Sequence, residues 1–80
     1  MSKRNNNEAL WGLDFGRNLQ RVLHCKGISQ GVLANKLGVT EAMLSRYIHG
    51  AAIPSVYKVG QMADIIGCDI SDLIKTNYEF

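Results

Sequence analysis

Residues 28–50 are ISQGVLANKLGVTEAMLSRYIHG, and this stretch decides the fold. Apolar side chains recur at helical spacing on both sides of the Gly38-Val39 step, which indicates two short helices. Ser29 and Thr40 are residue types that begin helices, and Gly38 suits the left-handed backbone of a tight turn. The stretch therefore predicts a pair of helices joined by a turn of about three residues.

The sequence on either side of this pair continues the helical pattern. A first helix is expected over residues 13–26, and residues 8–12 either extend it or pack over it. A fourth helix begins at Pro54-Ser55, and either Asp69 or Ser71 caps a short fifth helix. No alternating strand pattern competes, so the expected fold is all-α with five helices. The residues expected to face the core are Phe15, Leu19, Val22, Leu23, Val32, Leu33, Ala34, Leu37, Leu44, Tyr47, Ile48, Val56, Val59, Met62, Ala63 and Ile66.

Length and composition fit one small globular domain. The chain has 80 residues, of which 46% are hydrophobic and 20% charged, so we expect a single core. No apolar run approaches the ~18 residues of a membrane span, and no apolar signal-peptide segment follows the N-terminal charges. These features predict a cytoplasmic protein. Cys25 and Cys68 are too few for a disulfide framework, and we expect reduced thiols.

Charge is distributed unevenly along the chain, whose formal net charge is +2. Residues 1–58 contain eight Lys or Arg side chains and three acidic ones. Residues 59–80 contain one Lys and four acidic side chains. This asymmetry is typical of a basic face for a polyanion with an acidic end kept away from it. A solvated surface of mixed sign would give the same counts.

The helix pair has the pattern of a helix-turn-helix, in which the second helix lies in the DNA major groove. The similarity extends through FGRNLQRVLHCKGISQ (15–30), ANKLGVT (34–40), LSRYIHG (44–50) and IPSVYKVGQMADIIGCDISDL (53–73). These segments together resemble the lambda repressor and Cro family of helix-turn-helix regulators. The resemblance implies a compact five-helix DNA-binding domain over residues 13–75, preceded by a flexible basic arm (1–12) and followed by a short tail (76–80).

The resemblance also implies which residues contact DNA. Gln30 and His49 match positions that contact the DNA backbone, and Gln30 also braces a residue of the second helix of the pair. Arg46 is the strongest base-reading candidate, because a guanidinium group can bond both O6 and N7 of guanine. The full implied set is Gln30, Thr40, Glu41, Ala42, Met43, Ser45, Arg46 and His49.

Two of these residues depart from the family's usual polar pattern. Glu41 places an anion on the implied DNA face, and Ala42 offers no hydrogen bond. Glu41 could accept a hydrogen bond from cytosine N4 or repel phosphate, and Ala42 could contact a thymine methyl group. At the N-terminus, Lys3 and Arg4 either reach phosphates or the minor groove, or belong to a frayed end.

A homodimer is expected, because a single recognition helix contacts only a few base pairs. Two segments are candidates for the contact between copies. One is the fifth helix, with Leu73 and Ile74, and the other is the tail, with Tyr78 and Phe80. The alternative is that the two tail rings fold back onto their own core.

The sequence therefore predicts a sequence-specific transcriptional regulator that binds double-stranded DNA, a small repressor of bacterial or mobile-element type. The alternative is a protein-interaction module, or an antitoxin-like protein, that binds a partner through the same scaffold. We expect neither catalysis nor a metal, cofactor or small-molecule ligand, because no acid pair, nucleophile-base pair or phosphate loop is suitably placed. His24 and Cys25 are neighbours on one helix and supply too few ligands for zinc.

Overall fold

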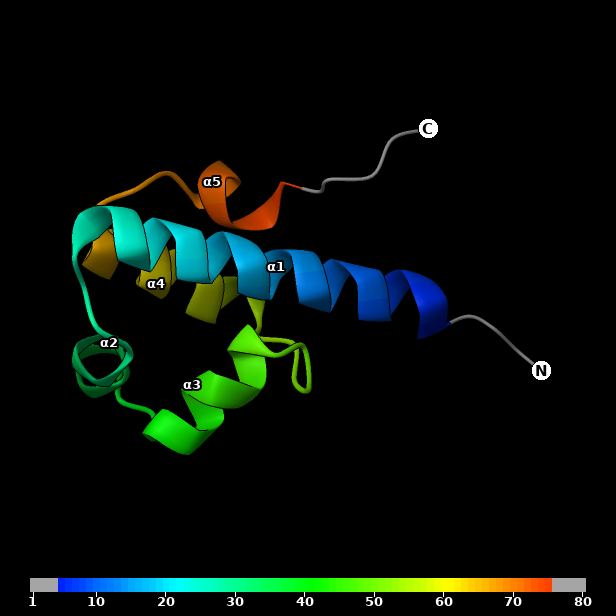
Figure 1. Ribbon diagram of the computed structural model, residues 1–80, viewed down its shortest axis with the longest axis horizontal. Helices are drawn as coiled ribbons and strands as arrows, with labels where there is room; N and C mark the ends of the chain where they lie inside the picture. Colours follow the sequence, from blue (N-terminus) through cyan, green and yellow to red (C-terminus); the bar gives the residue numbers. More distant parts are fainter. Residues whose placement is uncertain (1–4, 76–80) are drawn as a thin grey trace.

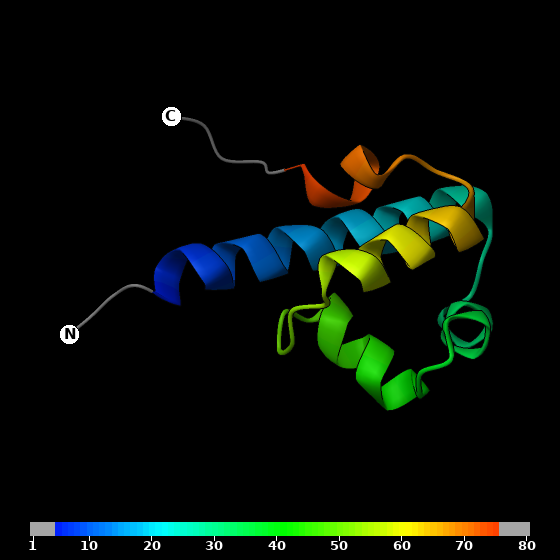
Figure 2. The ribbon, with the colours of Figure 1, turned by 180° about the vertical axis from the view of Figure 1, so that it is seen from behind.

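The computed structural model describes residues 5–75, with side chains described from residue 11 onward. The chain forms α1 (Asn5–Lys26), α2 (Gln30–Leu37), α3 (Glu41–Ile48), α4 (Val56–Ile66) and α5 (Ile70–Ile74). Figure 1 shows α2 and α3 together on one side of the long α1 helix and α5 on the other, and Figure 2 shows α4 running beside α1. The predicted all-α, five-helix fold is confirmed. Within residues 5–75, no helix combines the length and hydropathy needed to cross a membrane.

The first helix is longer than its apolar pattern predicts. α1 begins at Asn5 rather than at residue 13, so residues 8–12 extend this helix, which was one of the two alternatives for them. The pattern marks only the part of a helix that packs on the core, and the turns before it carry no such periodicity. Trp11 lies just before the predicted start and stacks on Phe15, with ring centroids 5.4 Å apart. Much of the predicted arm is therefore helix, and only residues 1–4 of it lie outside the described residues.

The predicted caps of the helix pair are confirmed. The Ser29 hydroxyl accepts a hydrogen bond from the Val32 N–H at 3.1 Å, and the Thr40 hydroxyl accepts one from the Met43 N–H at 3.0 Å. Between the two helices, Gly38 has a φ of 82°, which residues with a Cβ atom rarely adopt. Local chemistry within four residues therefore sets both the start of α2 and the start of α3.

The caps of the last two helices also follow the sequence. The Ser55 hydroxyl accepts a hydrogen bond from the Lys58 N–H at 3.1 Å at the start of α4. Of the two candidates for the start of α5, Asp69 rather than Ser71 is the residue that precedes the helix. The Asp69 N–H donates to the Asp72 carboxylate at 3.3 Å, which favours this short helix at its first turn.

Most of the predicted core is confirmed, with three corrections. Val32 is 47% exposed and Val56 is 80% exposed, because both lie in the first turn of their helix and point away from the neighbouring helices. Leu73, a predicted dimer contact, is fully buried and belongs to the core instead. The buried apolar residues are Phe15, Leu19, Leu23, Leu33, Ala34, Leu37, Leu44, Tyr47, Ile48, Val59, Met62, Ala63, Ile66 and Leu73.

The end of α3 lies directly on the backbone of α1 at Gly16. A Cβ atom at residue 16 would lie 1.8 Å from the carbonyl oxygen of Ile48 and 2.7 Å from its carbonyl carbon. One turn earlier, a Cβ atom at Gly12 would lie 3.5 Å from the carbonyl oxygen of Gly50. The absence of a side chain at these two glycines lets the two backbones meet. This contact determines where α3 sits relative to the rest of the domain.

A buried asparagine joins α1 to the end of α5. Asn18 is fully buried, and its Nδ2 donates hydrogen bonds to the carbonyl oxygens of Leu73 at 3.0 Å and Lys75 at 2.7 Å. The last carbonyl groups of a helix have no partner within the helix. Asn18 supplies that partner for the end of α5 and holds this helix against α1.

Candidate nucleic-acid interface

The third helix has one buried face and one exposed face. Leu44, Tyr47 and Ile48 are buried in the core, where α3 packs on α1 and α2. The opposite face carries the exposed residues Glu41, Ala42, Met43 and Arg46. Four of the predicted DNA-contacting residues therefore lie together on the surface of one short helix.

The other predicted residues of α3 already have partners within the helix. The Thr40 hydroxyl is engaged as the N-cap, so its oxygen is shared with the backbone of Met43. Ser45 is half-buried, and its carbonyl oxygen lies 2.8 Å from Nδ1 of His49. Since a carbonyl oxygen only accepts hydrogen bonds, this contact places a proton on Nδ1. A phosphate oxygen also only accepts, so an Nδ1 engaged in this way is not available to donate to phosphate.

The start of α2 is a surface that suits an anion. Gln30 is the first residue of α2 and is exposed, as expected for a phosphate contact. Backbone N–H groups in the first turn of a helix lack partners within the helix and attract negative charge. Among them, the N–H of Val32 is taken by the Ser29 hydroxyl, and α2 has no acidic residue of its own in this turn.

Glu41 of α3 lies against this first turn of α2. A Cβ atom at Gly31 would lie 3.0 Å from the Oε2 atom of Glu41 and 3.5 Å from its Cδ atom. The Glu41 carboxyl group therefore covers the bare backbone of Gly31. Sequence reasoning identified Glu41 but missed Gly31, since the two residues become neighbours only when α2 and α3 fold together.

The charges of the described residues are separated in space only in part. Lys36 and Arg46 lie on α2 and α3, whereas Asp69 lies just before α5 and Asp72 lies within it. Figure 1 shows α5 on the opposite side of α1 from α2 and α3. These two carboxylates lie away from the α3 surface, but the cations Arg21, Lys26 and Lys75 lie on the same side of α1 as they do. Lys3 and Arg4, the predicted arm contacts, lie outside the described residues.

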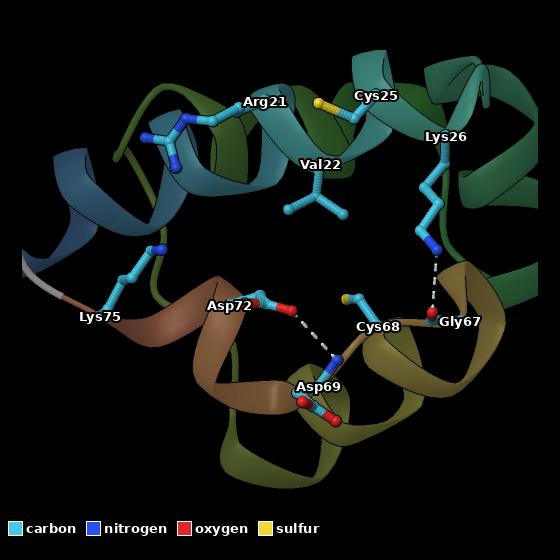
Figure 3. Close-up of a pocket in the computed structure, with 9 residues that line it drawn as sticks. All are labelled: Arg21, Val22, Cys25, Lys26, Gly67, Cys68, Asp69, Asp72 and Lys75. Carbon is cyan, nitrogen blue, oxygen red and sulfur yellow. Dashed lines mark hydrogen bonds between the residues drawn. The ribbon is translucent and has the colours of Figure 1, made fainter.

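A hollow of about 540 Å³ lies between α1 and the segment that contains α5. Figure 3 shows cations and carboxylates mixed around it. Lys26 donates from Nζ to the carbonyl oxygen of Gly67 at 3.2 Å across one end. The mixture of charges favours neither an anion nor a cation, so we place the candidate interface at α2 and α3. Its lining residues are Arg21, Val22, Cys25, Lys26, Gly67, Cys68, Asp69, Asp72 and Lys75.

Both cysteines line this hollow and both are free. Cys25 is exposed, and Cys68 is half-buried. Burial raises the pKa of the Cys68 thiol above its usual value, and the negative charge of Asp72 raises that pKa further. Among the described residues, no three His, Cys, Asp or Glu side chains are grouped as metal ligands.

The start of α4 and one face of α5 form an apolar surface, of which sequence reasoning had identified only Ile74, as a candidate contact between copies. Val56 and Tyr57 are 80% and 74% exposed, and Ile70 and Ile74 of α5 are 40% and 39% exposed. We refer to these four residues as the α4–α5 surface. Helical spacing had assigned Val56 to the core, because spacing alone cannot tell which apolar residues stay uncovered. A small groove of about 160 Å³ beside this surface is lined by Trp11, Pro54, Val56, Val59, Ile70 and Ile74.

Comparisons with known proteins point to the same part of the chain. A family model described as helix-turn-helix matches residues 26–73, which include α2, α3 and the turn between them. The chain is similar to the solution structure of the SOS-response transcriptional repressor LexA from Eubacterium rectale. The two are 27% identical with a TM-score of 0.74, and the match covers 88% of this chain and 78% of that one. The comparison with curated proteins found no match.

Proposed function

Since the chain belongs to the lambda repressor/Cro-like helix-turn-helix family of DNA-binding transcriptional regulators, we propose that it is a repressor that binds a specific DNA sequence. The observation that carries the proposal is the exposed face of α3. Glu41, Ala42, Met43 and Arg46 lie together there, on a helix whose other face is buried. In a helix-turn-helix protein this second helix enters the major groove.

The proposed repressor role and bacterial type are supported by the similarity to a bacterial SOS-response transcriptional repressor. Selection of bound duplexes from a random DNA pool, at a stated salt concentration, tests the proposal. A repressor of this kind enriches one sequence motif. Recovery of unenriched sequences would contradict specific DNA recognition.

We expect affinity for duplex DNA to fall steeply as salt concentration rises. Each phosphate that the protein neutralises releases bound counterions, so log K falls with log salt at a slope of roughly −0.9 per phosphate contact. Titration of a labelled duplex from low to moderate salt measures this slope. If no duplex is bound even at low salt, the protein-interaction module becomes the better explanation of the fold.

Arg46 and Gln30 are expected to act in different ways. Arg46→Ala should weaken binding and relax the preference at one base pair by ~1–3 kcal/mol, because it removes a two-pronged bond to guanine. Gln30→Ala should weaken binding to all sequences to a similar degree, because phosphates carry no base identity.

Binding of both variants to duplexes that differ at single base pairs separates the two roles. Arg21→Ala is the matched control for loss of one charge, since Arg21 lines the hollow on the α5 side of α1. It should change affinity little. Equal losses on every sequence for Arg46→Ala and Gln30→Ala would contradict the assigned roles.

The repressor is proposed to act as a homodimer joined through the α4–α5 surface. A single α3 contacts only a few base pairs, whereas two copies can bind half-sites about one helical turn, ~34 Å, apart. Val56 and Tyr57 are large apolar side chains left mostly exposed, and Figure 1 shows α5 across α1 from α2 and α3. A second copy can therefore cover this surface and leave α3 free for DNA. The tail with Tyr78 and Phe80 lies outside the described residues.

Tyr57→Asp is expected to give a monomer that loses cooperative binding to two half-sites, because the new charge would be buried at the contact between copies. Analytical ultracentrifugation with and without a selected duplex measures this. Val32→Asp, at another exposed apolar residue on α2, should leave the free dimer intact. Deletion of residues 77–80 tests the predicted role of the tail separately. A Tyr57→Asp protein that still dimerises would remove this surface from the mechanism.

A further inference from the structure

The Glu41 carboxyl group lies against the start of α2 without using its hydrogen-bonding capacity. It is the only acidic residue in the first turn of α3, and its carboxyl group also covers Gly31 in the first turn of α2. A carboxylate beside a helix N-terminus is favoured by the helix dipole, and here it lies beside two of them. None of the hydrogen bonds found among the described residues involves this carboxyl group. Its oxygens are therefore free to accept hydrogen bonds from a ligand.

The position of Glu41 also reduces the repulsion expected between an anion and DNA. α2 has no acidic residue in its own first turn, so Glu41 supplies the negative charge that this helix lacks. The negative charge of the carboxylate and the partial positive charges of the two helix N-termini partly cancel each other. A carboxylate placed in this way can approach the major groove at lower electrostatic cost than an isolated one.

We propose that Glu41 is a specificity-determining residue that accepts a hydrogen bond from N4 of cytosine at one position of the bound DNA, and that the absence of a side chain at Gly31 leaves room for its carboxylate in this position. This inference rests on the proposed DNA-binding function. A carboxylate only accepts hydrogen bonds. In the major groove cytosine presents a donor alone, whereas adenine presents an acceptor beside its donor and guanine and thymine present acceptors. Glu41 therefore selects cytosine and disfavours the other three bases.

Gly31 has a positioning role in this proposal. An alanine at residue 31 would place its Cβ 3.0 Å from Oε2, at the far end of a flexible side chain. The Glu41 side chain must then move, while the helix itself gains from replacement of a glycine. The structure thus offers a change that displaces the carboxylate and keeps both its charge and the fold.

The test compares binding of four proteins to duplexes that differ only at single base pairs of a selected site. Glu41→Gln is expected to shift the preference at one position from cytosine to adenine, since a glutamine amide can bond N6 and N7 of adenine. The preference for cytosine should fall on the order of 10-fold, with other positions unchanged. Gly31→Ala should lower the same preference several-fold and leave the affinity for an unrelated duplex unchanged.

Gly60→Ala is the matched control, because a Cβ at this position of α4 meets no atom within 4 Å. It should alter no base preference. If Glu41→Gln strengthens binding to every duplex equally and keeps all preferences, Glu41 acts only as a repulsive charge and the inference is wrong. If the unmodified protein binds no duplex at low salt, the proposed function itself fails, and that result is distinct from a loss of cytosine preference in a protein that still binds DNA.

Discussion

Gly16→Ala is expected to destabilise the domain by about 3 kcal/mol or more, because the new methyl group collides with backbone rather than with a movable side chain. Its Cβ would lie 1.8 Å from the carbonyl oxygen of Ile48. Only a separation of α1 from the end of α3 can relieve this overlap. That separation would also expose part of the core around Phe15 and Ile48, which are both buried.

Thermal unfolding followed by circular dichroism measures this effect. A loss of that size lowers Tm by roughly 12 °C or more, at about 4–8 °C per kcal/mol for a domain of this length. Gly60→Ala is again the control, because it makes the same substitution inside α4 where the Cβ meets nothing within 4 Å. It should raise stability by up to about 1 kcal/mol. A Gly16→Ala protein as stable as the control would show that α1 and α3 do not meet as described.

Asn18→Asp is expected to cost about 3–5 kcal/mol at pH 7, although the two side chains have nearly the same shape. Nδ2 of Asn18 donates to the carbonyl oxygens of Leu73 and Lys75 in a fully buried position. A carboxylate there would face two acceptors with no donor and would bury a charge. The end of α5 would lose its connection to α1.

This loss is expected to depend on pH in a defined direction. Burial beside two carbonyl oxygens favours the neutral carboxylic acid, so the pKa of the new group is higher in the folded state than its unfolded value of about 3.9. The variant is therefore least destabilised below about pH 4 and loses stability as the pH rises through that folded-state pKa.

Urea unfolding of both proteins at pH 4 and at pH 7 measures how much less stable the Asn18→Asp variant is than the unmodified protein at each pH. Asn35→Asp serves as the control, because Asn35 is exposed on α2 and its replacement should show no such trend. An equal loss at both pH values for Asn18→Asp would argue against a buried charge.

The candidate DNA-contacting residues stay predictions, and the structure shows only how they are grouped. Of the eight candidate residues, all except Gln30 lie on α3 or at its two caps, from Thr40 to His49. One short helix therefore brings seven of them together. The structure shows which of these side chains already have hydrogen-bond partners within the protein. The Thr40 hydroxyl is used in capping, and His49 bonds back to Ser45. Which of them face a base depends on how α3 is held, and that depends on Gly16 of a distant helix.

The sequence by itself determined the helices and most of their ends. Ser29, Gly38 and Thr40 act on backbone groups within a few residues, so their effect does not depend on the rest of the fold. The same is true of the apolar spacing that predicted most of the core. A periodic pattern within one helix is a local property, and it can be recognised before any helix has a neighbour.

Only the tertiary structure decided which surfaces meet and which stay uncovered. Asn18 and Lys75 are 57 residues apart in the chain, and no local rule relates them. The exposure of Val56, the burial of Leu73 and the contact of Glu41 with Gly31 were likewise settled when the helices packed. The physical reason is that burial and close approach depend on the relative placement of helices, and that placement is set by the fit of all five around one core.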